Sequence, residues 1–214
     1  MVALLLGSFG ALLLCAILCG ELLGIAERPD GSTALDSSIT SWMVAHRTQG
    51  LTTLARVLST LGSQTVLLPL AGAVALVLLV RRRFELAALL IAAWGGALLL
   101  YNLTKYFVHR PRPPSVIWLT DVGKTTSFPS GHATQSLATF LALGLVGTAW
   151  ISKPRWPGLL PALVLAGGIG WSRVYLGVHW TSDVLAGWLI AAAWITMVLW
   201  LTAIERLIER RQAD

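Results

Sequence analysis

Ser172 to Asp183 is the stretch whose side chains could most directly do chemistry, because it places an arginine, a histidine and an aspartate in otherwise apolar sequence. If the residues from Trp180 onward are helical, His179 and Asp183 lie four positions apart and share one face. A carboxylate beside an imidazole fixes its tautomer and stabilises positive charge on it, and the guanidinium of Arg173 suits phosphate or carboxylate. The plain alternative is a snorkelling arginine and an interfacial histidine at the end of a membrane helix.

Two other polar stretches would complete an anion-binding site. Lys105 and Arg112 follow the third apolar run, and with Arg173 they supply three positive charges without neighbouring acids. Such charges repel one another unless an anion neutralises them, and a phosphate dianion is the natural partner. Ser130 and Gly131 precede the fourth run, where the hydroxyl and the free N–H groups of a first helical turn would point at the anion. The pattern predicts a phosphate-binding site.

Two histidines give this site a reaction. His179 has a carboxylate within helical reach, so it is the better nucleophile toward phosphorus, with Asp183 holding one ring nitrogen protonated. His132 has no acid nearby in the sequence and is the better general acid for the departing oxygen. The product would be a phosphohistidine, which water hydrolyses with His132 acting as base. We expect no metal or other cofactor, because arginine, lysine and backbone N–H groups neutralise the phosphoryl oxygens and this residue set makes a poor metal site.

Three motifs in this order resemble the signatures of the type 2 phosphatidic acid phosphatase superfamily. They are Lys105-x6-Arg112-Pro113, Pro129-Ser130-Gly131-His132 and Ser172-Arg173-x5-His179-x3-Asp183, and no motif position departs from the pattern. The resemblance implies five phosphate-binding residues, which are Lys105, Arg112, Ser130, Gly131 and Arg173. It implies three catalytic residues, which are His132, His179 and Asp183. These are the roles that the chemistry suggests, and the family also implies magnesium-independent hydrolysis and inhibition by vanadate.

The composition places this site in a membrane protein. Of the 214 residues, 56% are hydrophobic and 12% are charged, whereas a soluble globular protein carries about a quarter charged residues. A spanning helix needs roughly 20 apolar residues, and candidates lie at about 2–25, 54–80, 84–108, 132–151, 157–176 and 181–204. The first run lacks a basic start and is long for a signal peptide, so we expect a retained helix. The sequence predicts an all-α, polytopic membrane protein, with residues 1–214 as a single domain of six transmembrane helices.

The basic residues between the runs suggest an orientation and form no stripe for nucleic acid. Eight lysines and arginines would fall on each side of a six-span bundle, but Lys105, Arg112 and Arg173 are already assigned to phosphate. Setting them aside leaves eight against five, and the larger group includes the tight turn at 81–83. Short basic turns favour the cytoplasm. We expect both termini there, the active site at the outer face, and a location in the inner (plasma) membrane.

Two segments would cover the outer end. Residues 28–50 contain Leu35, Ile39, Trp42 and Met43 at helical spacing, which fits a short amphipathic helix in the interface about as well as an irregular loop. Residues 109–130 are rich in proline, serine and threonine, and such a long polar segment suits a lid or mouth. Within the second run, Pro69 predicts a kink.

The leading function is removal of the terminal phosphate from a membrane lipid. Undecaprenyl pyrophosphate, phosphatidylglycerophosphate, phosphatidic acid and diacylglycerol pyrophosphate all fit the site, with a slight preference for a polyprenyl pyrophosphate or a broad range of lipids. The other class is a non-catalytic phospholipid-binding or transport protein that reuses the fold, although paired broken helices near the midplane are not evident in the sequence. The expected partners are a lipid phosphate and the bilayer, and the sequence leaves the oligomeric state open.

Overall fold

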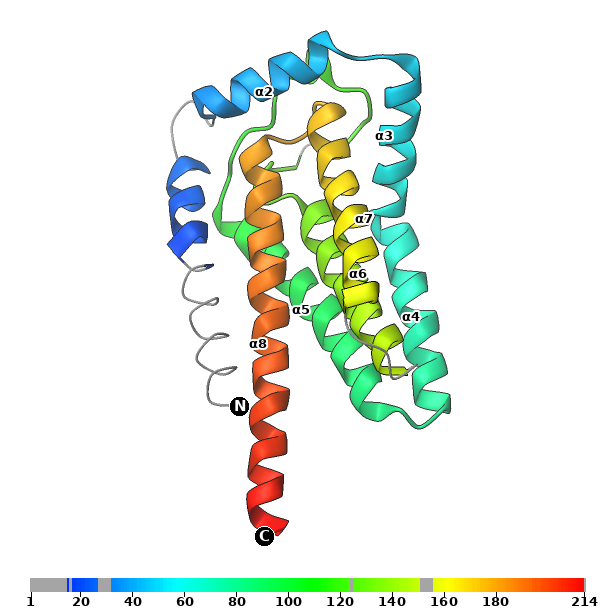
Figure 1. Cartoon of the computed structure of the whole chain (residues 1–214). Coiled ribbons are helices and arrows are strands. Elements are labelled where there is room, and N and C mark those ends of the chain that lie inside the picture. Colours follow the sequence, from blue (N-terminus) through cyan, green and yellow to red (C-terminus); the bar gives the residue numbers. More distant parts are fainter. Residues whose placement is uncertain (1–14, 16, 27–31, 124, 151–155, 214) are drawn as a thin grey trace.

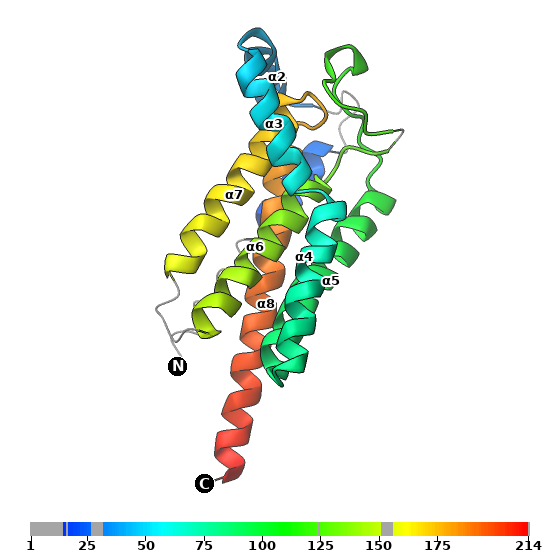
Figure 2. The ribbon, with the colours of Figure 1, turned by 90° about the vertical axis from the view of Figure 1, so that its right-hand side faces the viewer.

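The described part of the chain is entirely helical in its regular structure. The computed structural model describes residues 15, 17–26, 32–123, 125–150 and 156–213. Long helices run side by side in a bundle, and one shorter helix, α2, lies across one end, which we call the α2 end (Figure 1, Figure 2). After a short helix at Ile17–Ala26 come α2 (Ala34–Ala45), α3 (Gln49–Leu61), α4 (Gln64–Val80), α5 (Phe84–Phe107), the 3₁₀ turn η1 (Ser115–Ile117), α6 (Gly131–Trp150), α7 (Trp156–Tyr175) and α8 (Thr181–Ala213).

Four predicted helices are present close to their expected bounds. α5, α6 and α7 begin and end within one residue of the predictions, and α8 begins as expected but continues to Ala213. By length and apolar composition, α5 and the segment Thr181–Ile204 of α8 can each cross a membrane among the described residues, and α3 with α4 would make a third span. Most of the first predicted helix lies outside the described residues. The all-α prediction is confirmed, whereas the six-span arrangement stays a prediction.

The single helix predicted over 54–80 is wrong, because the chain forms two helices there. α3 and α4 are bent by 45° at the break between them. Gly62 ends α3, where its N–H donates to the carbonyl of Leu58 at 3.1 Å, and the Ser63 hydroxyl donates to the carbonyl of Thr60 at 2.6 Å. Pro69 lies inside α4. The bend therefore comes from a polar glycine–serine break, at which backbone groups find local partners, rather than from the proline.

The segment before α3 forms a helix, α2, rather than an irregular loop, and part of its polar face is buried. Asp36 and Thr40 are buried, whereas Leu35 and Trp42 are 65% and 58% exposed. The reason is a polar partner inside the protein, because the Asp36 carboxylate lies 2.9 Å from the guanidinium of Arg110. A buried ion pair, rather than apolar contact alone, thus orients α2 across the end of the bundle.

Helix α6 packs against α5, α7 and α8 and occupies the middle of the bundle. The core between these helices is built largely from alanine, leucine and valine, so that the helix axes can approach closely. Helices α6 and α7 approach each other closely at two glycines. A Cβ atom added to Gly144 would lie 2.5 Å from the carbonyl oxygen of Gly158, and one added to Gly158 would lie 2.5 Å from the carbonyl oxygen of Gly144. The two backbones therefore touch at this crossing.

This crossing predicts opposite effects for two glycines of α6. Gly144→Ala should destabilise the protein by about 1–3 kcal/mol, because the added methyl group forces two packed backbones apart. Gly147→Ala is the matched control, since no atom lies within 4 Å of a Cβ there and alanine is favoured over glycine in a helix by about 1 kcal/mol. Thermal unfolding in detergent should show a lower melting temperature for the first variant only. Equal melting temperatures would contradict the close contact.

Candidate active site

The three sequence motifs meet at one cavity at the α2 end of the bundle. The cavity has a volume of about 560 Å³, and its wall includes Lys105, Arg112, Gly131, His132, Arg173 and His179. Ser130 and Asp183 lie behind this wall, where the Ser130 N–H donates to the Asp183 carbonyl at 3.0 Å and ties the start of α6 to the start of α8. All eight predicted site residues are thus brought together, although they come from four segments separated along the chain.

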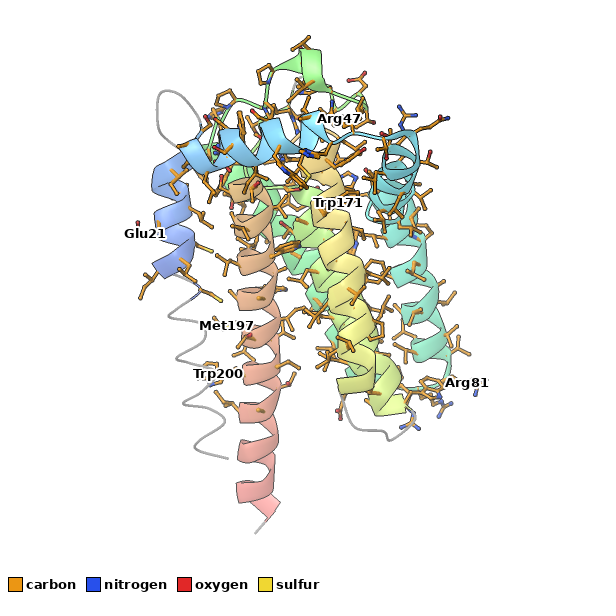
Figure 3. All side chains as sticks on the ribbon, turned by 45° about the horizontal axis from the view of Figure 1, so that its top comes forward. Glu21, Arg47, Arg81, Trp171, Met197 and Trp200 are labelled. Carbon is orange, nitrogen blue, oxygen red and sulfur yellow. The ribbon has the colours of Figure 1, made fainter. Side chains whose placement is uncertain are left out.

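The turn between α7 and α8 is fixed from two sides. Gly177 has a φ of 76°, which glycine adopts without strain, and a Cβ there would lie 2.6 Å from the Ile117 carbonyl. From the other side Arg47, at the corner between α2 and α3, donates through Nη2 to the Tyr175 carbonyl at 2.9 Å (Figure 3). His179 follows within this turn, so its backbone is held in place before any substrate binds.

His179 and Asp183 have the predicted relation. Nδ1 of His179 donates to Oδ2 of Asp183 at 3.2 Å, and both residues are buried. Burial lowers the pKa of His179 to about 3, against the opposing effect of the Asp183 carboxylate, and the charges of Arg112 and Arg173 lower it further. The imidazole is therefore neutral at physiological pH. Its Nε2 lies 3.2 Å from Nη1 of Arg112, at the cavity.

Three cations line the same cavity without acidic partners. Across the described residues, no carboxylate forms an ion pair with Lys105, Arg112 or Arg173. Lys105 donates instead to the carbonyl of Thr126 at 2.5 Å, and Arg173 donates to the hydroxyl of Ser59 on α3. Neutral carbonyl and hydroxyl partners orient a cation without cancelling its charge, so the cavity is strongly attractive to an anion.

The start of α6 adds the dipole of a helix amino end. Gly131 and His132 line the cavity at this end, where N–H groups of a first turn are available to an anion. A Cβ at Gly131 would lie 3.1 Å from the ring of Tyr101, so a larger residue would crowd α5. Ser130 is fully buried, and its hydroxyl accepts a long bond of 3.5 Å from the Ala133 N–H. Its predicted role as a phosphate donor stays a prediction.

Residues that the sequence reasoning missed surround Asp183. Arg110, Ser127, Asp36 and Ser182 are all buried around it or around its partner. From the sequence alone, neither Arg110 nor Asp36 is assigned to the site. The sequence did contain a usable signal. Acidic residues are few in this mostly apolar chain, and an acid that is buried inside it needs a partner.

The rest of the cavity wall is mostly polar and neutral, with one acid, Asp121, and one apolar side chain, Val122. Four of these residues lie at the break between α3 and α4, namely Thr60, Ser63, Gln64 and Thr65. Helix α5 contributes Tyr101 and Asn102. Thr120, Asp121 and Thr125 contribute from the segment expected to act as a lid or mouth. Lys124 lies outside the described residues. The helix break, which the sequence did not predict, therefore supplies one side of the site.

Known proteins share both the sequence pattern and the fold. The profile of the PAP2 superfamily matches residues 67–206, which include all three motifs. The chain is 32% identical over 145 residues to an undecaprenyl-diphosphatase of Sulfolobus acidocaldarius, covering 66% of this chain and 65% of that protein. It is 35% identical over 172 residues to a decaprenylphosphoryl-5-phosphoribose phosphatase of Mycobacterium tuberculosis, covering 76% and 86%.

The structural likeness extends over nearly the whole chain. The crystal structure of a transmembrane PAP2-type phosphatidylglycerolphosphate phosphatase from Bacillus subtilis superposes with a TM-score of 0.78 at 24% identity, covering 94% of this chain and 96% of that one. The fold is therefore shared even where the sequences differ. Because the superfamily profile covers most of the chain and its three motifs converge on one cavity, this protein belongs to the PAP2 superfamily of membrane phosphatases.

Proposed function

We propose that this protein removes the terminal phosphate from a lipid phosphate or lipid diphosphate, by way of a phosphohistidine formed on His179. The observation that carries the proposal is the cavity itself, in which three cations without carboxylate partners face a neutral imidazole backed by a buried aspartate. Arg112 lies close enough to Nε2 of His179 to hold a phosphate oxygen next to that nitrogen. Binding and attack would thus occur at the same place.

In the first step, the lone pair of His179 Nε2 attacks phosphorus as the bond from phosphorus to the lipid oxygen breaks. Once a bound phosphate offsets the positive charge of the cavity, His132 can carry a proton, which it gives to the departing oxygen. This oxygen leaves as a lipid alcohol, or as a lipid monophosphate when the substrate is a diphosphate. Asp183 accepts the hydrogen bond from Nδ1 and stabilises the positive charge that develops on the ring. Lys105, Arg112 and Arg173 neutralise the phosphoryl oxygens.

In the second step, water attacks the phosphohistidine. His132, now neutral, takes a proton from this water as the new oxygen–phosphorus bond forms and the nitrogen–phosphorus bond breaks. Inorganic phosphate leaves, and His179 returns to its neutral form with Nδ1 still protonated. The protons balance over the two steps, and His132 is the group that activates the attacking water.

The substrate would enter sideways from the bilayer, between the start of α4 and the end of α5. Thr65 and Asn102, at these two helix ends, line the cavity. One helical turn further from the α2 end, Leu68 and Leu99 are exposed on the same two helices, and this apolar surface suits a lipid tail. Among substrates we favour a polyprenyl phosphate or diphosphate, because two of the relatives are named for polyprenyl lipids.

For topology we propose six spans, with both termini in the cytoplasm and the cavity at the outer face of the inner membrane. Helices of 20 residues, such as α6 and α7, are about 30 Å long, enough for the hydrocarbon core. The basic turn between α4 and α5, with Arg81, lies at the end away from α2 (Figure 3), which supports a cytoplasmic position for that turn.

Thiol labelling tests this orientation. Val116 is exposed on the segment above the cavity, and Arg81 lies in the basic turn at the other end. In a background with Cys15 and Cys19 replaced by serine, Val116→Cys should react with a membrane-impermeant maleimide in intact spheroplasts. Arg81→Cys should react only after permeabilisation. The reverse pattern would place the cavity in the cytoplasm.

The alternative is a non-catalytic phospholipid-binding or transport protein, and a hydrolysis assay separates it from the enzyme. The purified protein should release phosphate from polyprenyl diphosphate or phosphatidylglycerophosphate in detergent, and EDTA should not change the rate. His179→Ala should lower kcat by at least about a thousandfold, because removal of a nucleophile leaves only residual catalysis.

His46→Ala is the matched control for this test, since His46 stacks on Trp42 in α2, outside the cavity wall. It should retain the parent rate. If no lipid phosphate is cleaved with or without EDTA, the binding protein is the better reading. If His179→Ala matches the parent, His179 is not the nucleophile.

The proposed entry predicts a separation of lipid from soluble substrates. Thr65→Trp should obstruct the path of the lipid tail between α4 and α5 and lower kcat/KM for a long-chain lipid phosphate by about tenfold or more. For para-nitrophenyl phosphate, which has no tail, kcat/KM should stay within about twofold. Leu79→Trp, at an exposed position near the other end of α4, is the control and should affect neither. Equal losses on both substrates would argue against lateral entry.

A further inference from the structure

A buried chain of charges lies behind the proposed nucleophile. We propose that Arg110 and Asp36 are positioning residues of the hydrolysis, which hold the Asp183 carboxylate toward His179 and keep its negative charge available to the ring. The inference rests on the proposed function, because it assigns a role in that reaction to two residues outside the three motifs. Arg110 and Asp36 are each only 1% exposed, so neither is a surface charge.

The Asp183 carboxylate is held by donors on both oxygens. Oδ1 accepts from Nη1 of Arg110 at 2.5 Å. Oδ2 accepts from the hydroxyl of Ser127, from the backbone N–H of Trp180 at 2.9 Å, and from His179. A carboxylate with donors fixed on both oxygens cannot rotate, so Oδ2 stays directed at the imidazole.

Arg110 is fixed in turn by Asp36. Its Nη2 lies 2.9 Å from Oδ2 of Asp36, while Nη1 also donates to the Ser182 hydroxyl at 2.8 Å. Asp36 accepts from both the backbone N–H and the hydroxyl of Ser182, at 2.9 and 2.7 Å. The guanidinium thus bridges two carboxylates through two different nitrogens, which a lysine ammonium with a single nitrogen does not reproduce.

Asp36 also belongs to the cap of α2. The Thr33 hydroxyl accepts from the Asp36 N–H at 3.0 Å, and the Asp36 carboxylate accepts from the Thr33 N–H at 3.3 Å. One carboxylate therefore caps α2, contacts the first turn of α8 and pairs with Arg110. Through the Asp36 carboxylate, the packing of α2 across the bundle is linked to the position of Asp183.

The charge balance explains why a second acid is useful. Arg110 alone beside Asp183 would form a neutral pair, and a neutral pair does little to stabilise positive charge on an adjacent imidazole. With Asp36 added, two carboxylates share one guanidinium and the group carries a net negative charge. That charge lies next to Nδ1 of His179, where it favours the protonated Nδ1 and the cationic phosphohistidine.

Charge-conserving and isosteric variants test the proposal. Arg110→Lys and Asp36→Asn should each lower kcat for lipid phosphate by about 10- to 100-fold, with KM and inhibition by inorganic phosphate within about threefold of the parent. Phosphate binding should persist because Lys105, Arg112 and Arg173 are untouched. In an Asp183→Asn background, Arg110→Lys should add little further loss, since it acts through Asp183. Arg56→Lys, an exposed arginine that donates to the Leu119 carbonyl, is the control and should behave like the parent.

A second measurement does not depend on turnover. The chain has four histidines, so ring-nitrogen NMR of histidine-labelled protein in detergent can assign the tautomer of His179. The parent and Arg56→Lys should show protonated Nδ1, and Arg110→Lys and Asp36→Asn should show a mixture of tautomers.

The outcomes separate this inference from the proposed function. An unchanged tautomer in both variants would overturn the positioning role, whether or not kcat falls through reduced stability. Parent-like kcat in both variants would overturn it as well. If the unaltered protein cleaves no lipid phosphate, the proposed function fails, while the tautomer measurement still decides whether Arg110 and Asp36 orient the His179–Asp183 pair.

Discussion

The contact on which this site depends is the hydrogen bond from Nδ1 of His179 to Oδ2 of Asp183. It leaves Nε2 unprotonated and directed at the cavity, and it exists only because the carboxylate stays ionised in a buried position. Burying a charge in apolar surroundings costs several kcal/mol unless partners offset it. Arg110, with Asp36 behind it, is such a partner. The packing around the α2 end keeps these buried hydrogen bonds and ion pairs intact.

A second constraint concerns the three cations of the cavity, whose charge is left without a neutralising partner. Lys105, Arg112 and Arg173 are oriented by carbonyl and hydroxyl groups, so their positive charge is kept in place but not cancelled. The site thus keeps Asp36 and Asp183 apart from the three cations of the cavity. The acids Asp36 and Asp183 lie behind the imidazole, where they support positive charge on the ring, and the bases lie in front of it, where they attract a phosphate.

Much of this arrangement could be predicted from the sequence. The bounds of α5, α6 and α7 follow from the lengths of their apolar runs, and the His179–Asp183 pair follows from a spacing of four at the start of a helix. Other features could not be predicted in the same way. The break at Gly62-Ser63 looked like part of one long apolar run, since a helix end depends on local polar contacts that hydropathy does not register. Asp36 lies between the apolar residues of an amphipathic pattern, which is typical of a residue on a solvent-exposed helix face.

The sequence by itself determined the family, the helical class and the set of groups that would do the chemistry, because motif spacing and apolar length are local properties of the chain. Only the tertiary structure decided which acid pairs with which base. Arg110 and Arg112 are two positions apart, yet Arg110 contacts Asp36 and Asp183 while Arg112 contacts His179 at the cavity. That division depends on where α2 and α8 pack against the segment between α5 and α6. Such contacts join residues 67 to 74 positions apart, and no local pattern in the sequence encodes them.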